Sequence, residues 1–197
     1  MRLGATDILG IDGNYIDSDA MQIPNSSFQP QDLTTDLEVK RQFDLAICLE
    51  VCEHLPKMKS VKVVDFLVKS APAVLFSAAI PGQGGVNHVN EQWQSFWVER
   101  FREKNYVAVD ILRPLFWRNP EVAYWYAQNI FLFVRGDKLA EYPAIPEASH
   151  GHSMPFDVVH PVRLEAVVRD LENCQEITIR QGATAIFRGL HRRILGN

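Results

Sequence analysis

Five short, mainly apolar segments limit the possible folds of this 197-residue chain more than any other feature of its sequence. Apolar runs without clean alternation are typical of strands that are buried on both faces, as in parallel sheets covered by helices. A chain of this length has room for one such domain, or for one domain with an appendage. The segments cover residues 7–12, 43–49, 73–79, 106–112 and 130–134.

Helical patterns lie between these segments. Residues 59–70 and 90–104 carry apolar side chains at helical spacing, and Asn90 is the expected N-cap of the second helix. Only residues 114–129 separate the last two strands, which predicts an antiparallel pair at an edge of the sheet. The pattern therefore predicts an α/β fold: a Rossmann-like, mostly parallel sheet with helices on both faces and an antiparallel edge strand.

The character of the chain changes after Asp137. Three prolines between residues 142 and 155 indicate a linker, a helix is expected at 161–173, and a tail follows at 177–195. We therefore expect a core domain at 1–137 and a C-terminal linker, helix and tail at 138–197.

Composition excludes several classes of function. The net charge is −4, so the chain is not built to hold nucleic acid by its charge, and no apolar run is long enough to span a membrane. Three cysteines without a repeated spacing do not make a disulfide framework, and no apolar leader begins the sequence. These features favour a cytoplasmic protein.

Two acidic residues, Asp12 and Asp32, are candidates for binding a ligand. Asp12 and Gly13 end the first strand, where a carboxylate can accept hydrogen bonds from both hydroxyls of a ribose, although an Asp-Gly turn has the same pattern. Asp32 could accept a hydrogen bond from an exocyclic amine, or it could cap a turn.

Two further segments carry groups capable of acid–base chemistry. The second strand is followed by Glu50, Glu53 and His54, which suit a general acid or base, or the start of a helix whose positive end favours acids. The third strand is followed by a glycine-rich loop with His88, which either faces a substrate or is a plain connection. We predict no metal site, because the spacing of His150, His152 and His160 does not suit one.

Taken together, these segments resemble the class I S-adenosylmethionine-dependent methyltransferases over about residues 5–136. The order and spacing of the segments is the specific part of the resemblance. The matching pieces are ILGIDG at 8–13, FQPQDL at 28–33, FDLAICLEVCEHLP at 43–56, AVLFSAA at 73–79 and GGVNHVNEQW at 84–93.

The resemblance implies a role for each matched residue. Asp12 and Gly13 would bind the ribose of S-adenosylmethionine, Asp32 and Leu33 its adenine, and Leu49 and Glu50 would lie along its methionine end. His88, and after it His54, would face the substrate and act as the general base where the acceptor must lose a proton. The implied partner is a small-molecule or sugar-containing methyl acceptor.

The sequence departs from the family at one place. The family's first strand and its GxGxG loop should precede Asp12 by roughly 20 residues, and the eleven residues before Asp12 do not contain that loop. We therefore expect either an N-terminally truncated methyltransferase or a degenerate, non-catalytic relative that serves as a binding or scaffold domain. A dehydrogenase ranks last, because it too needs a glycine-rich turn. A sheet without its central strand would have unpaired edges, which favours self-association into a homo-oligomer.

Overall fold

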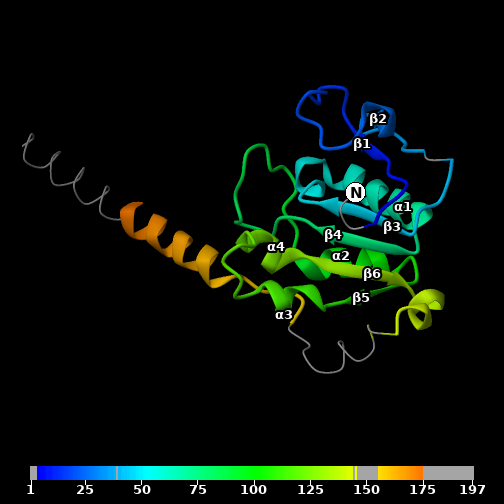
Figure 1. The fold of residues 1–197 in the computed structure, drawn as a ribbon. Coiled ribbons are helices and arrows are strands. Elements are labelled where there is room, and N and C mark those ends of the chain that lie inside the picture. Colours follow the sequence, from blue (N-terminus) through cyan, green and yellow to red (C-terminus); the bar gives the residue numbers. More distant parts are fainter. Residues whose placement is uncertain (1–3, 39, 144, 146–154, 175–197) are drawn as a thin grey trace, which may run out of the picture. The chain divides into compact units, whose positions relative to one another are not determined.

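The structure is a computed structural model that describes residues 4–38, 40–143, 145 and 155–174 (Figure 1). It divides into two compact units, Met1–Val158 and Val159–Asn197. In the second unit residues 161–174 are helical, which confirms the helix expected at 161–173. The boundary expected at residue 137 stays a prediction, and His150, His152 and the tail at 177–195 lie outside the described residues.

The first unit contains two separate sheets. One is a parallel pair, β1–β2, and the other has the strand order β3-β4-β6-β5, which Figure 1 shows from top to bottom. β3 and β4 are parallel, and β6 runs antiparallel to both β4 and β5. The strands are β1 Gly10–Asp12, β2 Phe28–Pro30, β3 Leu45–Leu49, β4 Ala73–Ser77, β5 Tyr106–Val109 and β6 Phe131–Arg135.

This architecture is the expected Rossmann-like α/β arrangement, with two refinements. Every apolar segment named from the sequence overlaps an observed strand, and the last two strands pair antiparallel as predicted. The strand of opposite direction, β6, lies one place inside the edge, so that β5 is the edge strand. The strand β2 was not expected, because its three residues are too short to show a period.

The two longest helices of the first unit pack against the same face of the larger sheet. They are α1, Lys57–Ser70, and α2, Gln94–Arg102. The rings of Phe101 and Phe133 stack with centroids 3.8 Å apart at the centre of this core. Core residues include Val63, Val64 and Leu67 from α1, Trp97 and Phe101 from α2, and Cys48, Val74, Phe76 and Phe133 from the strands.

The opposite face of the sheet is covered only in part. At the β5–β6 end, Val109 and Val134 are buried beneath Ile145 and its neighbours. At the other end, Leu45 and Ile47 of β3 are 45% and 61% exposed. Since β3 is also an outer strand, the larger sheet ends, as far as the described residues show, in an edge with exposed apolar side chains.

The connection between β5 and β6 is itself helical. It contains α3, Leu112–Phe116, and α4, Tyr124–Asn129, and shorter 3-10 helices occur at η1 Asn25–Ser27, η2 Cys52–His54 and η3 Gly136–Glu141. Within the described residues, no helix combines the length and apolar character needed to cross a membrane.

Asparagine 90 does not cap α2. The helix begins at Gln94, and the Asp157 carboxylate accepts hydrogen bonds from the backbone N and the Oγ of Ser95, both at 2.8 Å. Asn90 is instead buried, where its amide donates to the carbonyl of Cys52 and to Ser60. The expectation was wrong because the capping carboxylate belongs to Asp157, which follows Ser95 by 62 residues. No local sequence pattern reveals such a distant cap.

Arg113 is a fully buried charge in α3. It donates two hydrogen bonds to Asp110, at 2.9 and 2.5 Å, and two more to the carbonyls of Pro155 and Phe156. Its guanidinium carbon also lies 4.2 Å from the ring centroid of Phe131. One side chain thus holds three segments of the first unit together.

We expect Arg113→Met to lower the free energy of unfolding by about 3–5 kcal/mol, because it leaves the Asp110 carboxylate without its ion-pair partner. Arg102→Met is the matched control, since Arg102 makes the same kind of bidentate pair with Glu99 at an exposed position. That control should lower the free energy of unfolding far less, because water screens the exposed pair. Urea unfolding of both variants measures the difference, and equal losses would contradict this role of Arg113.

Candidate functional site at the carboxyl ends of the strands

In open α/β sheets, ligands bind beyond the carboxyl ends of the parallel strands. In this chain β1, β2, β3 and β4 are the strands with parallel partners, and the residues that follow them define the candidate site. Because β6 runs the other way, the end of α4 that precedes it lies at the same edge of the larger sheet.

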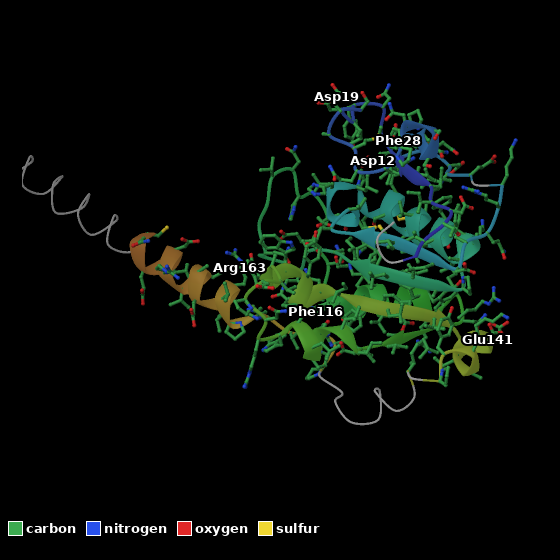
Figure 2. The ribbon with its side chains drawn as sticks, in the orientation of Figure 1. Asp12, Asp19, Phe28, Phe116, Glu141 and Arg163 are labelled. Atoms are coloured by element: carbon green, nitrogen blue, oxygen red, sulfur yellow. The ribbon has the colours of Figure 1, made fainter. Side chains whose placement is uncertain are left out.

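Asp12 is the last residue of β1 (Figure 2). Its Oδ1 accepts hydrogen bonds from the backbone N of Gly13, at 2.7 Å, and from the hydroxyl of Tyr15, at 2.8 Å. The hydrogen bond to Asp12 raises the pKa of Tyr15. A Cβ on Gly13 would lie 2.0 Å from the Tyr15 ring, so a side chain at this position would displace the tyrosine from Asp12.

Asp32 lies close to Asp12. The backbone N of Gln31 donates to the carbonyl of Asp12 at 2.7 Å, which fixes the end of β2 against the end of β1. Asp32 is exposed at the surface and accepts a hydrogen bond from the backbone N of Thr34, which lowers its pKa. It therefore caps a turn, one of the two roles open from the sequence, while Leu33 packs against the core.

Glu50 follows Leu49 at the end of β3 in a left-handed backbone conformation, with φ at 52°. This conformation is uncommon for a residue with a side chain. The backbone N of Glu50 donates to the carbonyl and the Oγ of Ser77, at 3.0 and 3.2 Å, which holds the turn against the end of β4. Glu50 is therefore not in a helix, although the sequence had left that possibility open.

A buried network of side-chain amides holds the Glu50 carboxylate. Gln83 donates to its Oε2 at 2.9 Å, and Asn129 donates to its Oε1 at 3.4 Å. Asn129 and Gln128 also donate to the Oε1 of Gln83, at 2.8 and 3.1 Å. These three amides were not expected from the sequence, where their only signal is the polar pair Gln128–Asn129 directly before an apolar strand.

Glu53 lies in η2 and is fully buried. Apart from the carboxyl group of Glu50, neither of its carboxylate oxygens has a hydrogen-bond partner among the described residues. Burial, and after it the nearby charge of Glu50, raises the pKa of Glu53 to about 8. Glu53 therefore holds a proton near neutral pH, as the acid member of a carboxyl pair can.

His88 and His54 meet across two segments of the chain. Their rings are in edge contact, with centroids 4.8 Å apart. The Nδ1 of His88 lies 2.9 Å from the Oε1 of Glu91, which also accepts hydrogen bonds from the backbone N of Gly82 and Gly84. Although burial opposes it, these hydrogen bonds hold the pKa of Glu91 below its usual value.

The loop at 80–93 is tied to η2 by its backbone. The N atoms of Val89 and Asn90 donate to the carbonyl of Glu53, at 2.9 and 3.0 Å. A Cβ on Gly85 would lie 2.3 Å from the Nε2 of His88, so this glycine makes room for the imidazole. The loop is therefore a fixed support for His88.

The structure gathers the expected site residues into two groups. Asp12, Gly13 and Asp32 lie together at the smaller sheet, and Glu50, Glu53, His54 and His88 lie together at the larger one. No metal site was expected here, yet among the described residues Glu53, His54 and His88 each offer a ligand atom within 4.8 Å of the others.

Comparisons with known proteins show likeness to solved structures only. No family model matches the chain, and no curated protein matches it. Magnesium protoporphyrin IX methyltransferase (ChlM) from Synechocystis PCC 6803 with bound SAM is similar at 17% identity and a TM-score of 0.40, over 55% of this chain and 45% of that one. LepI in complex with SAM is similar at 12% identity and a TM-score of 0.43, over 66% of this chain and 36% of that one.

The chain thus spans about half or less of the solved structures it matches. Likeness at these identities and TM-scores does not assign an activity. The assignment has to come from the residues of the site.

The buried Glu53 carboxyl predicts an unusual pH dependence of stability. Its pKa is about 8 in the folded protein against an ordinary 4.5, so its burial destabilises the fold increasingly between those two pH values. Glu53→Gln should therefore gain stability over the wild type as the pH rises, by a few kcal/mol at pH 9 and by little at pH 4.5. Urea unfolding at these pH values, with a chelator present, measures it, and a constant difference would contradict the shifted pKa.

Proposed function

We propose that this chain binds S-adenosylmethionine and transfers its methyl group to a small-molecule or sugar-containing acceptor. The observation that carries the proposal is the place of Asp12, a carboxylate at the carboxyl end of a parallel strand. Only its Oδ1 is engaged by the protein in the hydrogen bonds described above, through Gly13 and the exposed Tyr15. An acid at this place suits the two hydroxyls of a ribose.

Two other positions extend the cofactor site along the strand ends. Asp32 and Leu33 lie beside Asp12 and would meet the adenine, with the Asp32 carboxylate accepting from its amino group. Leu49 and Glu50 follow β3 and would lie along the methionine end, where the Glu50 carboxylate suits the amino group of that ligand.

We assign His88 as the general base that takes a proton from the methyl acceptor. Bound S-adenosylmethionine would supply a sulfonium methyl, an electrophile that needs alignment more than activation. With the ionised Glu91 accepting from Nδ1–H, the Nε2 of His88 keeps the lone pair and can take a proton from the acceptor. His54 contacts His88 and would face the same acceptor.

Calorimetric titration of the 197-residue chain with S-adenosylmethionine and S-adenosylhomocysteine tests the cofactor site. We expect Asp12→Ala to weaken binding at least about tenfold, because hydrogen bonds to a charged group contribute about 1.5–3 kcal/mol. Asp19→Ala is the matched control, since it removes an exposed acid from the loop that follows β1 (Figure 2).

Tyr15→Phe separates a specific site from a general effect of charge. It frees Asp12 Oδ1 from the phenol and keeps the carboxylate, so binding should be retained or tightened. Absence of binding by the wild-type chain, or equal losses in the Asp12 and Asp19 variants, would count against the proposal.

A non-catalytic binding or scaffold domain is the second candidate, and the open edge of β3 favours it. An uncovered apolar strand is a template for pairing with another chain, and we propose that a second copy of this chain occupies it. Ile47→Lys should then shift the protein toward monomer in sedimentation velocity experiments. Met58→Lys, at an exposed position on α1, should leave the distribution unchanged. A wild-type chain that stays monomeric at high concentration would refute the pairing.

We also propose a cytoplasmic location without nucleic-acid or membrane partners. Cys48 and Cys52 are buried, reduced thiols, as expected of a reducing compartment.

A further inference from the structure

Glu53, His54 and His88 form a cluster of metal-ligating groups that the proposed transfer reaction does not require. Glu53 and His54 come from η2, and His88 comes from the loop at 80–93. Their ligand atoms nevertheless lie within 4.8 Å of one another. The hydrogen bonds from Val89 and Asn90 to the Glu53 carbonyl fix the two segments in this arrangement.

The Glu53 carboxylate is an independent sign of a missing partner. Its side chain is completely buried, and apart from the carboxyl group of Glu50, which can share its proton, neither oxygen has a hydrogen-bond partner among the described residues. Buried polar groups in proteins are nearly always paired, and a buried carboxylate needs a hydrogen bond, a counter-charge or a metal ion. A cation between Glu53 and the two imidazoles would supply that partner.

The surroundings of His88 are those of a metal ligand. Histidines that bind metals usually donate their second ring N–H to a carboxylate, which fixes the tautomer and the ring orientation. The Nδ1 of His88 lies 2.9 Å from Glu91, and Gly82 and Gly84 hold that carboxylate in place. The Nε2 of His88 is thereby left as the ligand atom.

We propose that Glu53, His54 and His88 bind one divalent transition-metal ion, with Glu91 as the outer carboxylate that orients His88. Two imidazoles and one carboxylate suit zinc and its neighbours, whereas magnesium and calcium prefer oxygen ligands alone. Three protein ligands leave a coordination position for water or a substrate group. His54 is exposed, which gives the ion a route into the site.

The three ligand atoms need to move only a short distance toward one another to bind a zinc ion. Zinc holds imidazole nitrogens and carboxylate oxygens at about 2.0–2.2 Å, which places its ligand atoms roughly 3.4 Å apart. Side-chain rotation must therefore bring the most distant pair about 1.4 Å closer than the 4.8 Å limit of the cluster.

This inference does not rest on the proposed methyl transfer. A metal ion and a proton compete for the same lone pair of His88, so the general-base role belongs to the metal-free protein. Metal binding can be measured without S-adenosylmethionine, and the failure of either proposal therefore leaves the other standing.

The test is calorimetric titration of zinc into chelator-treated protein, with cobalt(II) absorption as a second readout. We expect one ion per chain in the wild type, and at least a hundredfold weaker binding after His88→Ala or Glu53→Gln. Glu91→Gln should weaken binding by about 10- to 100-fold, the usual effect of an outer-shell partner. Circular dichroism checks that each variant is folded.

Two controls keep the result specific. The double variant His150→Ala/His152→Ala removes the other closely spaced histidines of the chain and should retain the ion. Glu53→Gln keeps the size and shape of the side chain, so loss of the ion from a variant that circular dichroism shows to be folded cannot be attributed to unfolding. No stoichiometric ion in the wild type, or an ion lost only from the His150/His152 variant, would overturn the proposal.

Discussion

The burial of the Glu53 carboxyl group next to the half-buried Glu50 is the constraint on which the site depends. Two like charges in a low-dielectric interior repel each other and lose their hydration, so both cannot remain ionised without compensation. The amides of Gln83 and Asn129 donate hydrogen bonds to Glu50, whereas no donor among the described residues serves Glu53, whose carboxyl neighbour is Glu50 itself. Burial, and after it the nearby charge of Glu50, therefore keep a proton on Glu53 near neutral pH.

That arrangement explains much of the local structure. The left-handed turn at Glu50 brings its side chain from the end of β3 toward the amides. The amides come from the loop after β4 and from the end of α4, so three connections meet at one carboxylate. The same loop carries His88 and is joined to η2 through the Glu53 carbonyl. A substitution of Glu50 should consequently shift the positions of Glu53, His54 and His88 as well.

Most of the fold could be predicted from the sequence because its signals are local. Apolar runs such as 73–79 marked the buried strands, and the helical spacing at 59–70 marked α1. The place of Asp12 followed from its position after a strand. The amide network could not be predicted, because Glu50 and Asn129 are 79 residues apart and neither lies in a recognisable motif. The start of α2 was missed for the same reason, since Asp157 acts from a distant segment.

The division of the strands into two sheets links the fold to the proposed ligand. The sequence predicted unpaired strand edges, and among the described residues β3 is an outer strand with exposed Leu45 and Ile47. Asp12 belongs to the smaller sheet and Glu50 to the larger one. A ligand that contacts both residues would therefore bridge the two sheets and stabilise their arrangement.

A crystal structure of the chain with S-adenosylhomocysteine would test the central claim most directly. We expect both ribose hydroxyls within hydrogen-bond distance of the Asp12 carboxylate, with Tyr15 displaced or shared. The amino group of the ligand should lie near Glu50, and its sulfur should face the loop that carries His88. A ligand bound elsewhere, with Asp12 still engaged only by Gly13 and Tyr15, would contradict the assignment of this site.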